Sequence, residues 1–163
     1  MYKRQRLNCE SELKEKATWL TLILSTGEKS LLKSSRQNNG LKVRVIELEE
    51  ENWTSSAKNA DSILETINQN YGHLGIKFAE IILKMSQEEL VALVEEGMET
   101  MRIELHKSGI GDEYTERRLK NFGLIIATAC LTGKMLGKHF DVKGISKILV
   151  NAEKESVKTR AFD

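Results

Sequence analysis

From residue 57 onward, the hydrophobic residues recur at the three- and four-residue spacing that places them on one face of a helix. Ser86 followed by Glu89 forms a capping box, which marks the start of a long helix. Glycines supply the stops between helices, as they commonly do after a last turn. The pattern predicts a helix from Ala57 to Gly72, one with a face of Phe78, Ile81, Ile82 and Met85, a long one from Ser86 to Gly109, another from Asp112 to about His139, and a last one over roughly Lys143–Ser156.

The first 56 residues carry a different pattern, one that is typical of short strands among polar segments. Leu20–Leu24 is an unbroken apolar run, as expected for a strand covered on both faces. A second strand is predicted over Val43–Leu48, after turn chemistry at Asn38–Gly40. Because two strands do not make a stable sheet alone, either a small sheet is hidden among the helices or the rest of the sheet lies elsewhere. Short helical segments are predicted near Glu10–Lys16 and Lys29–Ser35.

The fold class predicted from these patterns is mostly α with a small β element. It divides the chain into an N-terminal part over residues 1–56 and a helical bundle over residues 57–163. With 163 residues, 40% of them hydrophobic and 30% charged, the chain is long enough for a proper core. Its net charge of +1 supplies no overall basic field for nucleic acid.

Cysteine usage and hydropathy predict a cytoplasmic protein. Cys9 and Cys130 are far apart in the sequence, which favours two free thiols in a reducing compartment. No apolar run has the length of a membrane span, and the N-terminus lacks the apolar segment of a signal peptide. Histidines and cysteines are too dispersed to predict a metal site. Complete phosphate-loop, nucleophile-elbow and zinc-protease motifs are also missing from the sequence.

Three features carry candidate chemistry, each with an ordinary alternative that the residues alone favour. Ser25 and Thr26, at the end of the first predicted strand, can hold a water or a phosphate oxygen, or they satisfy backbone groups in a turn. Arg44 can reach a phosphate across a subunit boundary, or it lies in solvent on an edge strand. Of Arg117 and Arg118, in the first turns of a helix, one can face a nucleotide, or both face water.

Taken together, the motifs resemble a known family. The segment W-x4-LSTGE is followed by GLKVRVIEL and then by NYGHLGIKF, and the later segment ERRLKNFGLIIATACLTGKMLG adds a basic, then alanine-rich helix. These segments resemble the carboxyl-terminal half of the phage and mobile-element ATPases grouped as domain of unknown function 927, which are often described as helicases or primase-helicases. The resemblance covers about residues 4–150.

The resemblance implies the back end of a P-loop, AAA+-like ATPase core, contributing two strands followed by a helical lid. In that scheme Thr26 positions the attacking water, Arg44 is the arginine finger, and Ser25 and Arg118 contact the nucleotide, with Arg117 the alternative to Arg118. ATP and Mg²⁺ are implied for the full-length family and are not expected for this chain alone, because the Walker A and Walker B segments are missing from it. The implied partners are an upstream ATPase segment or a homo-oligomeric ring, with DNA as a further partner.

Two functional hypotheses follow. In the first, the chain is the carboxyl-terminal fragment of a DNA-replication ATPase or helicase of phage or mobile-element origin, inactive alone. This hypothesis predicts unpaired strands with exposed apolar faces. In the second, it is a free-standing helical interaction module or phage regulator without enzymatic activity, which predicts a closed structure with those faces covered.

Overall fold

In the described part of the chain, every regular element is an α-helix. The computed structural model describes residues 22–27, 29–34, 39–49 and 53–161, and the helix predicted near Glu10–Lys16 lies outside them. The described helices are α1 (Leu31–Ser34), α2 (Asn39–Arg44), α3 (Ala57–Gln69), α4 (His73–Lys84), α5 (Gln87–Lys107), α6 (Glu113–Leu136) and α7 (Val142–Ala161).

The prediction of a two-strand β element is wrong for the described residues. Val43 and Arg44 complete helix α2, and the backbone N–H of Val45 still donates to the carbonyl of Leu41 at 3.0 Å, in helical register. Ile46 packs against the helical core, so its side chain is covered by helices and not by strands. The turn predicted at Asn38–Gly40 is also wrong, because α2 begins at its second residue. β-branched residues favour strands only where a neighbouring strand completes the pairing.

The first predicted strand is likewise not formed. Leu22–Leu24 has no regular secondary structure, and its three side chains are 92%, 82% and 94% exposed. The preceding residues Leu20 and Thr21 lie outside the described ranges. The fragment hypothesis predicted unpaired strands with exposed apolar faces. The exposed apolar run agrees with the second part of that prediction, and the absence of strands from the described residues contradicts the first. The interaction hypothesis expected this run to be covered, and it is not.

Local capping chemistry sets the helix starts that the sequence predicted. Ser86 and Glu89 form the expected capping box, with Glu89 Oε2 accepting from the Ser86 backbone at 2.7 Å and Ser86 Oγ accepting from the Glu89 backbone at 3.2 Å. Asp112 Oδ1 accepts from the backbone N–H of Thr115 at 2.6 Å and starts α6. Gly137, with a φ of 59°, ends α6 before the predicted limit. A left-handed residue at this place is a common helix stop.

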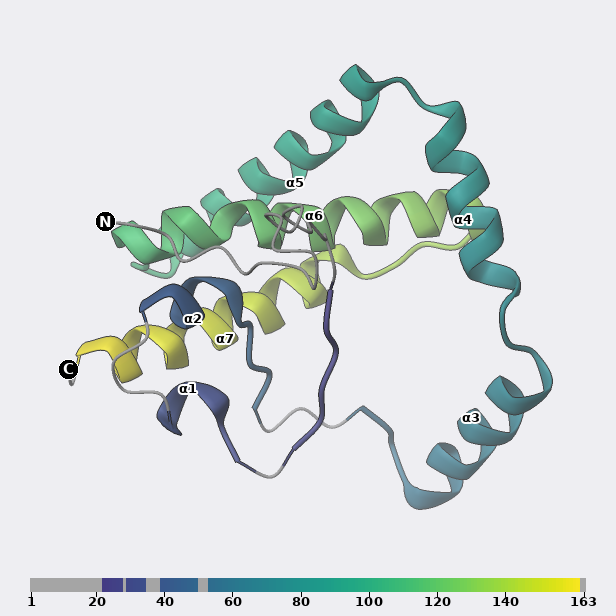
Figure 1. The fold of residues 1–163 in the computed structure, drawn as a ribbon, viewed down its shortest axis with the longest axis horizontal. Coiled ribbons are helices and arrows are strands. Elements are labelled where there is room, and N and C mark those ends of the chain that lie inside the picture. Colours follow the sequence, from purple (N-terminus) through teal and green to yellow (C-terminus); the bar gives the residue numbers. More distant parts are fainter. Residues whose placement is uncertain (1–21, 28, 35–38, 50–52, 162–163) are drawn as a thin grey trace, which may run out of the picture.

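The core lies between α5, α6 and α7, which Figure 1 shows side by side with α1 and α2 near α7. Each of these three long helices buries an apolar stripe, and burial of such stripes is the main favourable term in folding. The buried cluster consists of Met101, Leu105, Leu119, Phe122, Ile126, Leu149 and Val150.

Two glycines allow α5 and α6 to approach closely. A Cβ atom added to Gly97 of α5 would lie 2.4 Å from the carbonyl oxygen of Gly123 in α6. A Cβ atom added to Gly123 would lie 2.4 Å from the side chain of Met98 and 2.9 Å from the carbonyl of Val94. Both distances are far inside van der Waals contact, so this crossing requires residues without side chains.

Helices α3 and α4 differ from the three core helices, because neither contains a buried residue. Figure 1 shows α3 standing apart from the three core helices, joined to α4 by a short link. We call residues Ala57–Lys84 the α3–α4 arm. The sequence predicted both helices and their apolar stripes correctly. The structure leaves the stripe of α3 exposed, whereas the predicted face of α4, formed by Phe78, Ile81, Ile82 and Met85, is half-buried.

We expect Gly97→Ala to lower the free energy of unfolding by about 1–3 kcal/mol, because a methyl group cannot be placed at the α5–α6 crossing without moving backbone. Gly75→Ala is the matched control, since Gly75 is also helical and meets nothing within 4 Å. Gain of helix propensity makes that control neutral or slightly stabilising. Urea unfolding followed by circular dichroism measures both, and equal stabilities would contradict the close crossing.

Candidate functional site

The hydroxyl residues predicted to contact a phosphate lie on the surface. Ser25 and Thr26 follow the exposed run Leu22–Leu24, in a segment without regular secondary structure, and both are exposed. Because the described residues form no sheet, no strand end among them positions these two side chains. Their predicted roles therefore have no structural support within this chain and stay predictions.

Arg44 is the last residue of α2 and its side chain is exposed. Its Nη1 donates to the carbonyl oxygen of Gly40, one helical turn earlier, at 3.3 Å. Arg44 lines an open recess together with Arg117 of α6, whose guanidinium pairs with the carboxylate of Glu113. Two of the predicted arginines thus share one surface, where the carboxylate of Glu113 offsets part of their charge. Ser25, Thr26 and Arg118 do not line this recess.

Unlike the exposed side chains of Arg44 and Arg117, the side chain of Arg118 is fully buried. Its Nη1 lies 3.0 Å from Glu153 Oε2 and donates to Ser156 Oγ at 2.6 Å, both on α7. Its guanidinium carbon also lies 5.4 Å from the centre of the Phe122 ring. Thr115 Oγ donates to the second carboxylate oxygen of Glu153 at 2.7 Å. Arg118 therefore ties α6 to α7, and a nucleotide could reach it only if these helices separated.

The acidic partner of Arg118 was not identified from the sequence, although a signal for it exists. Glu153 follows Leu149 by four residues, and Ser156 follows Glu153 by three, which is the spacing of the buried face of α7. A charged residue in the register of an apolar stripe requires a charged partner inside the core. Arg118 has the same property in α6, where it precedes buried Phe122 by four residues.

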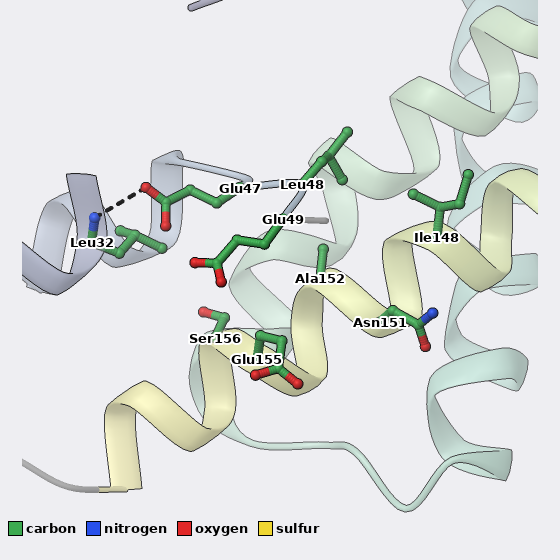
Figure 2. A pocket seen from close by; sticks show the side chains of 9 residues that line it. All are labelled: Leu32, Glu47, Leu48, Glu49, Ile148, Asn151, Ala152, Glu155 and Ser156. Atoms are coloured by element: carbon green, nitrogen blue, oxygen red, sulfur yellow. Dashed lines mark hydrogen bonds between the residues drawn. The ribbon is translucent and has the colours of Figure 1, made fainter. Parts of the chain in front are cut away.

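A second small recess lies between α7 and the segment that follows α2. Figure 2 shows Glu47 pointing toward α1, with Glu49 and Glu155 at the rim. Glu47 accepts hydrogen bonds from Ser30 Oγ at 2.6 Å and from the backbone N–H groups of Leu31 at 2.6 Å and of Leu32 at 3.1 Å. Its carboxylate therefore holds the start of α1 against the bundle, which explains the position of Glu47 without a ligand.

The largest run of exposed apolar side chains that belongs to regular structure is on the α3–α4 arm. On α3 these side chains recur at helical spacing, and they end at Tyr71, which is 76% exposed. On α4, Ile76 and Leu83 are exposed and lie seven residues apart with Glu80 between them on the same side, and Leu83 is 84% exposed. The exposed stripe of α3 is of the kind that is typical of interaction sites. The exposed set is Ile63, Leu64, Ile67, Tyr71, Leu74, Ile76 and Leu83.

No family model, curated protein or solved structure matches this chain. The resemblance to the phage ATPase family, with its implied ATP, Mg²⁺, DNA and ring partners, therefore stays a prediction. Within the described ranges, no group of three histidine, cysteine or carboxylate residues is arranged to hold a metal ion. None of the described helices combines the length and the apolar content that crossing a membrane requires.

We expect Arg118→Met to lower the free energy of unfolding by about 3–5 kcal/mol, because it leaves the Glu153 carboxylate buried without its cation. The neighbouring Arg117→Met is the matched control, and loss of its exposed pair with Glu113 should cost about 1 kcal/mol or less. Adding Glu153→Leu to Arg118→Met should recover most of the lost stability. Equal urea midpoints for the two arginine variants would show that the α6–α7 pair does not stabilise the fold.

Proposed function

We propose that this chain is a helical protein-interaction module without catalytic activity of its own, and that the α3–α4 arm is its binding surface. The observation that carries the proposal is the contrast between the arm and the core. α5, α6 and α7 bury their apolar stripes against each other, whereas the apolar stripe of α3 is exposed and that of α4 is only half-buried.

Two physical arguments support a binding role for the arm. Helices of about 12–15 residues or fewer are marginal in water unless an apolar face is packed, and α3 has 13 residues. Covering an apolar side chain is worth about 1.5–3 kcal/mol when it passes from fully exposed to fully buried. A partner that covers the arm therefore stabilises both helices and gains binding energy from the same contacts.

The arm also has a clear division into two faces. Ile63, Leu64 and Ile67 share one side of α3, while Lys58 and Glu65 lie on the other. This division favours a partner that presents an apolar helix or groove, as amphipathic helices commonly bind one. Cys130, a free thiol in α6, supports the cytoplasm as the compartment of this interaction.

Photo-crosslinking tests the surface without knowledge of the partner. A photoreactive amino acid at Ile67, on the apolar face of α3, should give defined crosslinked products in the native host cell. The same group at Gln69, on the polar face of α3, is the matched control and should give few or none. Equal products from both positions, or none from Ile67, would contradict the proposed binding face.

A second candidate function is supported by the recess that Arg44 and Arg117 share. Two guanidinium groups on one surface suit a phosphate, and the resemblance implies that Arg44 completes an ATPase site formed by another segment. In this candidate, ATP is hydrolysed only by a complex of this chain with that segment. The role of Arg44 as the arginine finger of the complex stays a prediction.

We expect the chain alone to hydrolyse ATP at background rates, because sensor and finger residues only complete a site built elsewhere. Adding the polypeptide encoded upstream separates the two candidates in a steady-state ATPase assay. Arg102, another exposed arginine, supplies the control variant Arg102→Ala. The ATPase candidate is supported if ATP turnover is abolished by Arg44→Ala and retained in Arg102→Ala. Turnover indifferent to Arg44, or none, contradicts it.

A further inference from the structure

The charges of the chain nearly cancel, but they are divided unevenly between its helices. α5 contains six glutamates against one arginine and one lysine, whereas α7 contains four lysines and one arginine against two glutamates. One of these two glutamates, Glu153, is buried and paired with Arg118, so it adds no negative charge to the surface. α7 therefore presents a locally basic surface, which the net charge of the chain conceals.

The four lysines of α7 lie in one line along its exposed side. Lys143, Lys147, Lys154 and Lys158 are all exposed. Their spacing of four, seven and four residues places them within about 60° of one another around the helix axis. Asn151 lies on the same side, so no carboxylate interrupts the line. At 1.5 Å per residue the line is about 22 Å long, and we call its four lysines the lysine stripe.

Most of the lysine stripe has no negative partner among the described residues. Lys158 pairs with Glu155 at 2.6 Å, at the border of the stripe. Lys143, Lys147 and Lys154 form no ion pair with a described residue, and no carboxylate lies three or four positions from any of them in the helix. Like charges four residues apart destabilise a helix, and the stripe contains two such pairs. An anionic ligand would relieve this repulsion.

The composition of this surface indicates which class of anion it suits. None of the large apolar side chains that are exposed in the described residues lies on α7, because the apolar face of this helix is packed in the core. Protein interfaces are centred on apolar and aromatic side chains and contain few lysines. A helix that lies on a membrane places its apolar face in the lipid, and that of α7 is occupied by the core. Nucleic acid instead offers regularly spaced phosphates, which lysines contact as point charges.

We propose that the lysine stripe of α7 binds the phosphate backbone of a nucleic-acid duplex. A duplex carries one negative charge per about 1.7 Å of its axis, so a line of lysines about 22 Å long meets several phosphates at once. Because contacts to phosphates carry no sequence information directly, this binding is independent of base sequence. The stripe is separate in the chain from the α3–α4 arm, and the proposal does not depend on the function proposed for the arm.

The test measures binding of the full chain to a fluorescein-labelled DNA duplex of about 30 base pairs, by fluorescence anisotropy between about 25 and 200 mM KCl. We expect the logarithm of the association constant to fall linearly with the logarithm of the salt concentration. The slope should be about −3, because the three lysines without an ion pair displace about three counterions. A duplex of the same length and a different sequence should bind equally well.

The variant Lys147→Gln with Lys154→Gln removes two charges from the middle of the stripe. We expect it to bind the duplex about tenfold or more weakly at the lowest salt concentration, with a slope that is smaller by about two. The control Lys58→Gln with Lys77→Gln removes the same charge from the α3–α4 arm and should retain the original affinity and slope. Thermal unfolding should match in all three proteins, since all four lysines are exposed.

Three results would overturn the proposal. The first is no binding of the duplex at about 25 mM KCl, where phosphate contacts are strongest. The second is binding with a salt slope near zero, and the third is an equal loss of affinity in the stripe variant and the arm variant. Competition with a poly-glutamate peptide tests the other class of polyanion. A peptide that binds the stripe more tightly than the duplex would assign the stripe to an acidic polypeptide and contradict a nucleic-acid ligand.

Discussion

The contact between Gly97 and Gly123 sets the geometry on which the rest of the described structure depends. With no side chain on either residue, the backbones of α5 and α6 meet directly, and Met98 fits over Gly123. This approach fixes the crossing of the two longest helices, and the buried side chains on either side of it pack as a consequence. Dispersion contacts fall steeply with small gaps, so a wider crossing would loosen the whole core.

A buried charge pair then fixes how α7 lies on this pair of helices. The hydrogen bonds from Arg118 and Thr115 to α7 require one position of Glu153 along the helix axis. Apolar packing alone would tolerate small slides of α7, whereas a displaced Glu153 would lose both its partners in a buried setting. In this fold the glycine contact sets the distance between α5 and α6, and the ion pair sets the register of α7 along α6. The burial of Arg118 is thus explained by the packing of α6 against α7.

The sequence predicted those parts of the fold that local interactions decide. Ser86 and Asp112 start helices because their side chains accept nearby backbone N–H groups, and this chemistry is visible in a few consecutive residues. Val43–Leu48 was predicted as a strand from its β-branched residues, but the segment has helices and not strands as neighbours, and those neighbours decide its conformation.

In the candidate site, too, the features that depend on long-range packing could not be predicted from the sequence. That Arg44 and Arg117 face one recess depends on the packing of α2 on α6, and the burial of Arg118 depends on Glu153, far along the chain. The apolar stripe of α3 was readable from its spacing, but its exposure was not. Whether a stripe is covered is a property of the assembled helices.

The uncovered arm also links the lifetime of this protein to what it binds. Helices without buried side chains open locally at little cost in free energy, and open segments are where proteases cut. A partner that binds only the formed arm shifts this opening equilibrium by mass action, in proportion to the logarithm of its concentration. An unoccupied chain would be degraded first, so the amount of intact protein in the cell would follow the supply of arm-binding partner.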